Sequence, residues 1–280
     1  MRKKKYYENN KEIFAVKSKK YRDDNRTQIL EDKKKYYHEN KIEINNQKKL
    51  NKQTEEGCLN NLIHQTKQRN KKLNIDEPYD IDIEYLYQLI KDQESKCIYC
   101  KHKLIIKQNS NELSQISIDR ILSSLSYKKS NIQLICLFCN LAKSESSHDI
   151  YDEFIDVLTN KREFDNTNVK INKNIISQLV STCRKYDIKK EYDLKNIIST
   201  TQIRELLKKQ NNKCLLTGIN FVNATTKFFP YKMSVDRIDN TKGHTLENCQ
   251  LVCMAINLGK LNKSNEDMIK YIKEIREINK

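Results

Sequence analysis

Long hydrophobic runs are missing from this sequence. Its 280 residues contain no apolar run of about 18 residues, the length that spans a bilayer, and its start, MRKKKYYENNKEIF, lacks the apolar stretch of a secretory signal. Tryptophan is absent, and there are four glycines and two prolines. We therefore expect a soluble, intracellular protein without a membrane-spanning segment, long enough for two compact domains and an extension.

Acidic residues are too few to balance the basic ones. The chain has 53 Lys and Arg residues against 37 Asp and Glu residues, a formal net charge of +16. An AT-rich genome would also favour Lys, Asn and Ile, but it would not remove the charge. A folded chain with this charge attracts polyanions. Nucleic acid, and double-stranded DNA in particular, is the expected partner.

Nine cysteines occur in a chain without a recognisable export signal, so we expect paired cysteines to be metal ligands rather than disulfides. Cys97 and Cys100 form one C-x2-C pair, and Cys136 and Cys139 form another. Four thiolates at this spacing complete the tetrahedral shell of a structural Zn²⁺, on which so polar a unit would depend for folding. The alternative is four unliganded core cysteines. The isolated cysteines, expected to be buried as small apolar residues, are Cys58 and Cys183.

Residues 1–56 form a basic segment without glycine or proline, with 17 basic and 10 acidic residues. The segment repeats every 15 residues, in the triplets Tyr6-Asn10-Phe14, Tyr21-Asn25-Ile29 and Tyr36-Asn40-Ile44. A spacing of four residues places each triplet along one face of a helix. Because a helix this polar buries little surface, we expect either a solvated helix or an arm that becomes ordered when it binds a partner. Lys and Arg interleaved with Tyr suit phosphate contacts and base stacking.

The remainder of the chain contains an internal duplication. A shift of 117 residues aligns two 47-residue stretches without a gap and with 12 identities. The repeated residues are Cys97 and Cys214, Asp119 and Asp236, Arg120 and Arg237, Asn131 and Asn248, Cys136 and Cys253, Asn140 and Asn257, and Lys143 and Lys260. We interpret this pattern as a tandem duplication.

The duplication predicts an α+β protein with four segments. These are a basic helical arm over 1–56, a first domain over 58–158, a linker over 160–174 and a second domain over 175–280. Each domain is expected to contain two helices, a cysteine knuckle, a β-hairpin that carries the Asp-Arg pair, a loop, a short helix and a closing helix.

The second copy lacks a complete set of zinc ligands. Thr217 stands where the first copy has Cys100, and Ile256 stands where it has Cys139. We expect an apolar core in place of the metal, supplied by Phe221, Phe228, Phe229 and Met233. The alternative is a rebuilt Cys3His shell of Cys214, Cys249, Cys253 and His244.

The order of these residues resembles the HNH endonuclease family, whose ββα-metal site lies inside a treble-clef zinc fold. The resemblance covers Cys97 to Lys143 and Cys214 to Lys260, about a third of the chain. The stretch DRIDNTKGHTLEN is particularly similar to HNH proteins of phages and large DNA viruses, and the basic arm is similar to extensions found on them. The resemblance implies two tandem treble-clef (HNH-like) domains, and a virus-encoded protein that acts in the host cytoplasm or nucleus.

The resemblance also assigns roles to residues. The ligands of a catalytic Mg²⁺ or Mn²⁺ at a scissile phosphate would be Asp119 and Asn140 in the first copy, and Asp236 and Asn257 in the second. The residues that pin the loop behind the hairpin would be Asn131 and Asn248. A hard divalent cation takes carboxylate and amide oxygens and neutralises charge that develops on the phosphate, so the donor types suit this chemistry.

One position departs from the family. The family has a His general base directly after the hairpin Asp, whereas both copies have an arginine, Arg120 and Arg237. A guanidinium stays protonated at neutral pH, so it can clamp a phosphate or stabilise negative charge but cannot accept the proton. His244 is the candidate base in the second copy. Tyr127 aligns with it in the first copy, where His148 is a more distant alternative.

Three functions remain open on the sequence. The first is a metal-dependent DNA endonuclease of the HNH type, with the second copy as the catalytic one and the first as a zinc-stabilised scaffold. The second is a catalytically inactive tandem treble-clef protein that binds nucleic acid. A zinc-bearing adaptor between proteins is the third, and it leaves the charge unexplained.

Overall fold

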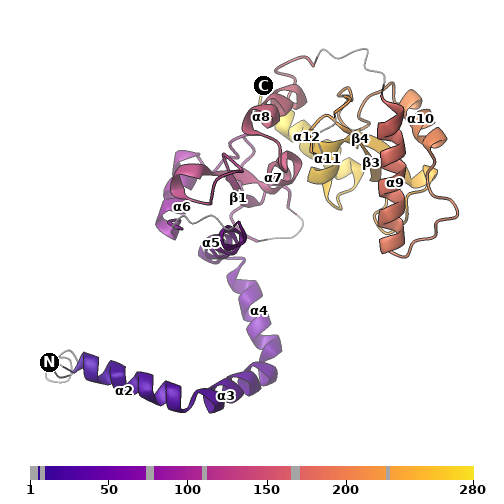
Figure 1. Cartoon of the computed structure of the whole chain (residues 1–280). Coiled ribbons are helices and arrows are strands. Elements are labelled where there is room, and N and C mark those ends of the chain that lie inside the picture. Colours follow the sequence, from indigo (N-terminus) through magenta and orange to yellow (C-terminus); the bar gives the residue numbers. More distant parts are fainter. Residues whose placement is uncertain (1–5, 7–9, 74–78, 109–111, 165–170, 225–227) are drawn as a thin grey trace. The chain divides into compact units, whose positions relative to one another are not determined.

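The computed structural model describes residues 6, 10–73, 79–108, 112–164, 171–224 and 228–280. The chain divides into two units, Met1–Gln53 and Thr54–Lys280 (Figure 1). The first unit, here called the arm, is helical, and its helices are α2 (Lys11–Asp24), α3 (Arg26–Glu39) and α4 (Lys41–Asn51). No residue of these three helices is buried. The predicted helical arm is therefore present. Its helices are interrupted at Asn25 and Asn40, and the sequence pattern did not predict these breaks.

The second unit, here called the body, contains the same series of elements twice. The first series is α5 (Glu55–Lys72), α6 (Ile83–Asp92), β1 (Ile116–Arg120), β2 (Ile132–Cys136), α7 (Leu137–Lys143) and α8 (His148–Leu158). The second is α9 (Lys173–Lys189), α10 (Thr200–Lys209), β3 (Met233–Arg237), β4 (Cys249–Cys253), α11 (Met254–Lys260) and α12 (Asn265–Ile278). From α6 to α7, each bound recurs 117 residues later. The expected α+β class and element order are confirmed.

Two predicted boundaries fall inside helices. α5 begins at Glu55 because the Thr54 side chain caps it by accepting a hydrogen bond from the Gly57 backbone. α9 begins at Lys173 because the Asn172 side chain accepts from the Asn174 backbone. The last residues given to the arm and to the linker therefore belong to the first helix of each copy. Residues 165–170 of the remaining predicted linker lie outside the described residues.

Each copy is built around a two-stranded antiparallel hairpin. In β1 and β2, Asp119 lies opposite Gln133, and in β3 and β4, Asp236 lies opposite Gln250. Every residue of β2 and β4 is buried, since α6 and α7 contact the first hairpin and α10 and α11 contact the second. Burial on both faces explains why these strands read as apolar runs rather than as alternating patterns.

The two copies pack on each other through their short helices. α7 and α11 lie next to each other between the two hairpins (Figure 1). Gly259 of α11 faces the Phe138 ring of α7 so closely that an added Cβ would lie 2.5 Å from it. Tyr271 of α12 packs edge-on against the same ring, with 5.4 Å between centroids. The duplicated halves therefore form one packed body.

The core agrees with most of the burial predicted. The isolated cysteines Cys58 and Cys183 are buried, and burial raises their pKa values to about 11 and about 12. Phe221 and Met233 are buried in the second copy, Phe229 is partly buried against the core, and Phe228 is half-exposed. In the part of the chain that the structure describes, no helix has the length and apolar character needed to cross a membrane.

Candidate metal centre and candidate catalytic cleft

Four cysteines of the first copy meet at one point. The Sγ atoms of Cys97, Cys100, Cys136 and Cys139 all lie within 4.8 Å of one another, and all four residues are buried. The sulfurs of Cys100 and Cys136 are 3.6 Å apart. Zn–S bonds of about 2.3 Å in a tetrahedron place sulfurs about 3.8 Å apart, so this donor set fits a tetrahedral metal ion such as zinc.

Hydrogen-bond donors surround the cluster. The Cys139 backbone N–H donates to Cys136 Sγ at 3.4 Å, and the Tyr271 hydroxyl donates to the same sulfur at 3.5 Å. The Asn279 amide donates to the Cys100 carbonyl at 2.8 Å. Tyr271 and Asn279 belong to the second copy, so the C-terminal end of the chain closes over the knuckles of the first. Donors of this kind orient thiolate ligands and stabilise their charge.

The thiols cannot all ionise unaided. Burial raises the pKa of the Cys139 thiol well above its ordinary value, and the neighbouring Cys136 has the same effect on Cys100. A buried cluster of four thiolates therefore needs a cation, because it would otherwise concentrate negative charge away from water. The four-cysteine group could therefore hold a metal ion such as zinc, both in its chemistry and in its geometry.

The corresponding point of the second copy is different. Burial alone would raise the pKa of Cys214, but hydrogen bonds with Cys253 and Thr217 outweigh burial and lower the pKa to about 7. The rebuilt Cys3His shell is not formed, because among the described residues only the four cysteines of the first copy form a metal-binding group. His244 instead contacts Asp187.

The aspartates of both hairpins are buried in matching polar contacts. Asp236 accepts from Lys260 at 2.8 Å and from Gln250 at 2.7 Å, and both bonds fall on Oδ2. Asp119 accepts from Lys143 on Oδ1 at 3.2 Å, and from the neighbouring Gln133 on Oδ2 at 3.0 Å. The Lys260 side chain is fully buried and that of Lys143 is 2% exposed. The copies differ in one respect: the second directs both bonds to a single carboxylate oxygen.

The loop after each hairpin strand is held by an asparagine. Asn248 accepts from the Asp239 N–H at 2.9 Å and donates to the carbonyls of Asp239 and Gly243 at 3.0 and 2.9 Å. Asn131 makes the three equivalent contacts 117 residues earlier, with Leu122 and Ser126. These are the contacts of a residue that pins a loop.

The second pair of asparagines lies on the short helices. The Asn257 amide donates to the Ser234 hydroxyl at 2.7 Å and to the Val235 carbonyl at 3.1 Å. The Asn140 amide donates to the Ser117 hydroxyl. In both copies the amide nitrogen faces the hairpin, so the two asparagines are fixed to the strand that carries the aspartate.

The two arginines are directed inward. Arg237 donates to the carbonyls of Asn240 and Lys242 at 3.2 and 2.9 Å, and it lies 4.4 Å from the centroid of the Tyr186 ring. Arg120 donates to the Leu125 carbonyl, which is equivalent to that of Lys242, at 2.8 Å. The contacts organise the loop. The proposed clamping of a phosphate or stabilising of negative charge by these side chains stays a prediction.

His244 is held by a carboxylate from outside the motif. Asp187 of α9 is fully buried; its Oδ1 lies 2.7 Å from His244 Nδ1, and its Oδ2 accepts from the His244 backbone at 2.8 Å. A carboxylate acceptor places the ring proton on Nδ1, so Nε2 carries the lone pair. Burial lowers the pKa of His244, although Asp187 raises it, so the ring is neutral at neutral pH.

The first copy has a different pair at this point. Tyr127 replaces the histidine, and its backbone N–H donates to the Asn70 side chain at 2.8 Å. Asn70 lies 117 residues before Asp187. The more distant candidate base, His148, contacts the Tyr99 hydroxyl through Nδ1 at 2.8 Å, and Tyr99 in turn accepts from Gln133 at 3.0 Å. A histidine paired with a buried carboxylate is therefore a feature of the second copy.

The candidate residues of the second copy share one cleft. It measures about 370 Å³, and its polar lining includes Asp236, Arg237, His244 and Asn257. α9 supplies another wall, which includes Cys183 and Tyr186. Asn248 lies behind the loop that forms the cleft rim. The structure thus brings together the four residues whose side chains the chemistry would need.

Asp187 and Gln250 were missed in the sequence, and they contact the cleft residues His244 and Asp236. Asp187 lies 57 residues before its histidine, and α9 showed no motif. The Asn70 and Asp187 pair falls outside the stretch in which the duplication was recognised. Extending the 117-residue shift to α5 and α9 pairs Asn70 with Asp187, but the two residues differ, so the shift does not link Asp187 to His244. Gln133 and Gln250 are one of the 12 identities of the recognised stretch, which was the signal for them.

Comparisons of the chain with protein-family models, with curated proteins and with solved structures found no match. The resemblance to the HNH family rests on the residues named above and stays a prediction.

Proposed function

We propose that the second copy is a metal-dependent endonuclease of the HNH type that hydrolyses phosphodiester bonds in DNA. The observation that carries the proposal is the single cleft lined by Asp236, Asn257 and His244, with Asp187 behind the histidine. Carboxylate, amide and neutral imidazole are the groups that hydrolysis by a metal-assisted water requires. The positive net charge of the chain favours a polyanionic substrate.

Asp236 and Asn257 would hold the divalent cation. Both hydrogen bonds to Asp236 fall on Oδ2, so Oδ1 would serve as the metal ligand, and the amide nitrogen of Asn257 faces the strand. Bound Mg²⁺ or Mn²⁺ would neutralise charge on the phosphate and the leaving oxygen. The first copy differs here, because Asp119 uses both oxygens for Lys143 and Gln133.

His244 would act as the general base. Its Nδ1 proton is directed to Asp187, and Nε2 can take a proton from a water molecule in the cleft. Asp187 fixes the ring orientation and the tautomer, and it favours the imidazolium that forms. Arg237 has the role of holding the loop that carries His244, through its bonds to the Asn240 and Lys242 carbonyls.

The first copy would then serve as a metal-stabilised scaffold. Its four cysteines would hold a structural zinc ion, and Tyr127 stands where the second copy has the base. A tyrosine hydroxyl is a poor proton acceptor at neutral pH. The first copy also packs α7 against α11 and so supports the helix that carries Asn257.

One observation favours a second candidate, an inactive protein that binds nucleic acid. Both aspartates pair with a buried lysine, and this contact alone accounts for their presence in both copies. A cation at Asp236 would lie near the Lys260 ammonium, which opposes its binding. Neither candidate changes the assignment of the four-cysteine centre.

Nicking of supercoiled plasmid with Mg²⁺ or Mn²⁺ separates the two candidates. Asp236→Asn and Asp119→Asn form a matched pair, since asparagine keeps the shape and a hydrogen-bond acceptor for the buried lysine. We expect Asp236→Asn and His244→Ala to abolish nicking and Asp119→Asn to leave it unchanged. Salt-sensitive DNA binding by the wild type, with no cleavage in either metal, would establish the inactive protein instead.

A further inference from the structure

The arm bends at intervals of 15 residues. Asn25 and Asn40 separate its helices, with φ of −109° and −108° and ψ of 18° and 13°. The Asn25 side chain donates to the Tyr21 carbonyl at 2.8 Å, and the Asn40 side chain donates to the Tyr36 carbonyl at 2.9 Å. These carbonyls also accept the backbone N–H of the same asparagine. A side-chain donor that enters the helical ladder bends a helix, so each repeat begins with the same bend.

Basic residues recur in register with these bends. Lys11, Arg26 and Lys41 directly follow Asn10, Asn25 and Asn40. A second set, eight residues further along each repeat, consists of Lys19, Lys34 and Lys49. Eight residues make slightly more than two helical turns, so the two basic residues of each repeat lie about 80° apart on one side of their helix, here called the basic face.

Most acidic residues of α3 and α4 lie away from this face. Asp32 and Glu39 stand six and 13 residues after Arg26, and Glu43 stands two after Lys41. These spacings turn a helix by about 200–240°, so these carboxylates point to the opposite side. In α2, Glu12 and Asp23 stand seven and four residues from Lys19 and lie on its side of the helix. The charges are therefore sorted by side in α3 and α4.

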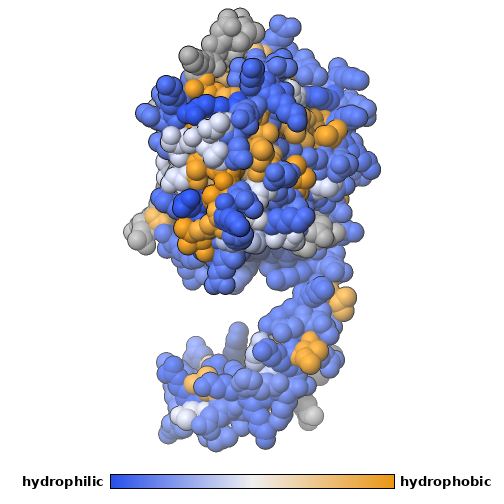
Figure 2. Space-filling model, turned by 90° about the vertical axis from the view of Figure 1, so that its right-hand side faces the viewer, coloured by the Kyte–Doolittle hydropathy of each residue, from blue (hydrophilic) through white to orange (hydrophobic). Residues whose placement is uncertain are grey.

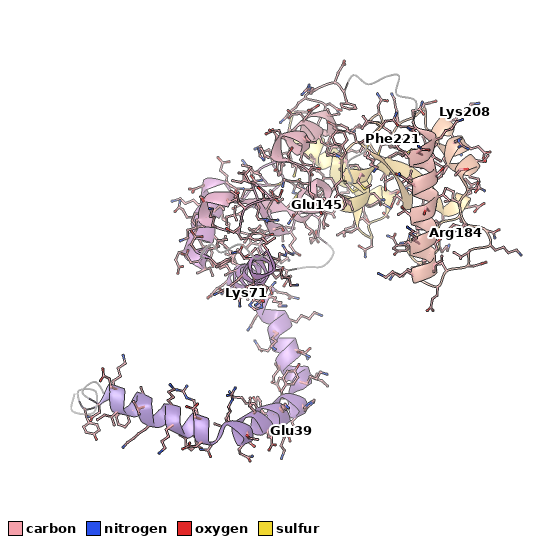
Figure 3. All side chains as sticks on the ribbon, viewed as in Figure 1. Glu39, Lys71, Glu145, Arg184, Lys208 and Phe221 are labelled. Carbon is pink, nitrogen blue, oxygen red and sulfur yellow. The ribbon has the colours of Figure 1, made fainter. Side chains whose placement is uncertain are left out.

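Tyrosines border the basic face and are open to solvent. Tyr21 and Tyr36 are 65% and 63% exposed. Figure 3 shows the side chains of α2, α3 and α4 extending outward from the helices, and the arm surface in Figure 2 is hydrophilic with isolated hydrophobic residues. Aromatic rings beside cations suit contact with sugars and bases.

We infer that the basic face is a modular binding surface for the phosphate backbone of nucleic acid, with one 15-residue repeat as its unit. A repeat is about 22 Å long, which is close to the length of six base pairs of duplex. Each repeat presents two cations on one side and one exposed tyrosine, and contacts to phosphate carry no sequence information. The arm therefore binds duplex DNA without sequence preference, and its affinity grows with the number of repeats.

Other partners fit the arm less well. Pairing with a second copy would bring like-charged basic faces together and would cover few apolar residues. A membrane surface requires a continuous apolar face. In the arm, exposed apolar residues such as Val16, Leu30 and Ile42 are scattered around the helices.

The test is DNA binding by the full chain across NaCl concentrations, measured by fluorescence anisotropy with a duplex of about 40 base pairs. Mg²⁺ and Mn²⁺ are omitted, so no cleavage is involved. Arg26→Gln with Lys41→Gln removes two charges from the basic face. Its control, Lys20→Gln with Lys35→Gln, removes two charges that lie nine residues from Lys11 and Arg26, on the opposite side. We expect the slope of log K against log salt to weaken by about two for the first pair, and by less than half a unit for the control.

A register test keeps every charge. Two alanines inserted after Leu30 rotate α4 and the end of α3 by about 200°, whereas four alanines rotate them by about 40°. We expect the two-alanine insertion to weaken binding about tenfold and the four-alanine insertion to bind almost as the wild type does. Equal losses in the two charge variants, or equal binding by the two insertions, would overturn the inference in favour of a general charge effect.

The inference relies on the proposed function only for the choice of DNA as probe. Nicking can fail while the charge and register variants behave as expected, in which case the nuclease is wrong and the arm assignment stands. Binding to phosphatidylserine vesicles that is stronger than binding to the duplex, with the same sensitivity to the insertions, would instead make the arm a membrane-binding segment.

Discussion

The two copies of the body share a backbone and differ in what their side chains can do. Both bury an aspartate against a lysine and a glutamine, and both pin the following loop with an asparagine. The first copy gathers four thiols, while the second has Thr217 and Ile256 at two of those positions. The second copy has the His244–Asp187 pair where the first has Tyr127 and Asn70.

This difference shows which parts of the duplicated unit are structural. The contacts that recur 117 residues apart hold the hairpin, the loop and the short helix together, and they are here called the shared frame. Residues outside the shared frame differ in chemical type between the two copies. The Asp-Arg pair occurs twice because the aspartate meets a buried lysine and the arginine organises the loop, and any catalytic role in the second copy adds to these contacts.

Metal removal is expected to have the largest effect, and it tests whether the first copy alone holds a metal ion. We expect purified protein to carry one zinc ion per chain, and Cys100→Ser to lose both the metal and the cooperative folding of the first copy. A structural zinc site supplies on the order of 10 kcal/mol of folding free energy. Elemental analysis and thermal unfolding measure both effects. Cys214→Ser is the matched control, and a loss of zinc in that variant would contradict the assignment of the metal to the first copy.

The buried lysines test the shared frame. Replacing Lys260 or Lys143 with Met leaves a buried aspartate without its partner, which costs about 3–5 kcal/mol of unfolding free energy. We expect the larger loss for Lys260, because its ion pair is the more deeply buried of the two. Urea unfolding followed by circular dichroism gives the two values. Losses below about 1 kcal/mol in both would show that the pairs are not part of the frame.

An Asp187 variant tests whether the His244–Asp187 pair gives the second copy a catalytic role that the first copy lacks. Asp187→Asn removes the carboxylate that fixes the His244 tautomer, and a general base contributes about 10²- to 10⁴-fold to a rate. We expect single-turnover nicking to fall by about 10²-fold with DNA affinity unchanged. Asn70→Asp in the first copy is the counterpart variant, and it should leave nicking unaffected. Equal activity of Asp187→Asn and the wild type would remove His244 from the mechanism.

Gly259 tests the contact between the copies. Gly259→Ala places a Cβ 2.5 Å from the Phe138 ring, and overpacking of this kind costs about 1–3 kcal/mol, against a gain of about 1 kcal/mol in helix propensity. We expect a net loss of about 1 kcal/mol in urea unfolding. Phe138→Leu in the same chain should recover part of that loss. Additive effects of the two changes would mean that the residues do not interact.

The pH dependence of nicking is expected to show the smallest effect. Burial lowers the pKa of His244 from 6.5, so the neutral base persists to mildly acidic pH. We expect constant nicking from pH 7 to 8 and a fall of about tenfold per pH unit on an acidic limb that lies below pH 6.5. Asp187 raises the pKa of His244, so Asp187→Asn should move this limb to lower pH. A limb above pH 7 would point to a different base.

Much of the fold could be predicted from local pattern. The 117-residue repeat, the cysteine spacing and the apolar periodicity of the helices predicted the element order because each depends on neighbours in the sequence. The boundaries at Glu55 and Lys173 depend on the capping contacts of Thr54 and Asn172, which the duplication did not reveal. The bends at Asn25 and Asn40 depend on a side chain that competes for a helical carbonyl.

The candidate site could be predicted only in part. The cysteine cluster followed from spacing, because four thiolates at two short intervals have few alternatives. The inward direction of Arg120 and Arg237 did not follow, since the same residue type can clamp a phosphate or hold a loop. Asp187 could not be assigned to His244 from the sequence, because a partner 57 residues away is chosen by the packing of α9 on the hairpin.

The sequence by itself determined the repeats, the basic arm, the four cysteines that could hold a metal ion and the replacement of two of them in the second copy, because these are properties of residue type and spacing. The tertiary structure alone decided which polar groups meet. It brings Tyr271 to Cys136 across 135 residues, Asp187 to His244 across 57, and α7 to α11. Such contacts are set by packing within each copy and between the copies, and buried polar groups pair with whichever partner that packing places within hydrogen-bond distance.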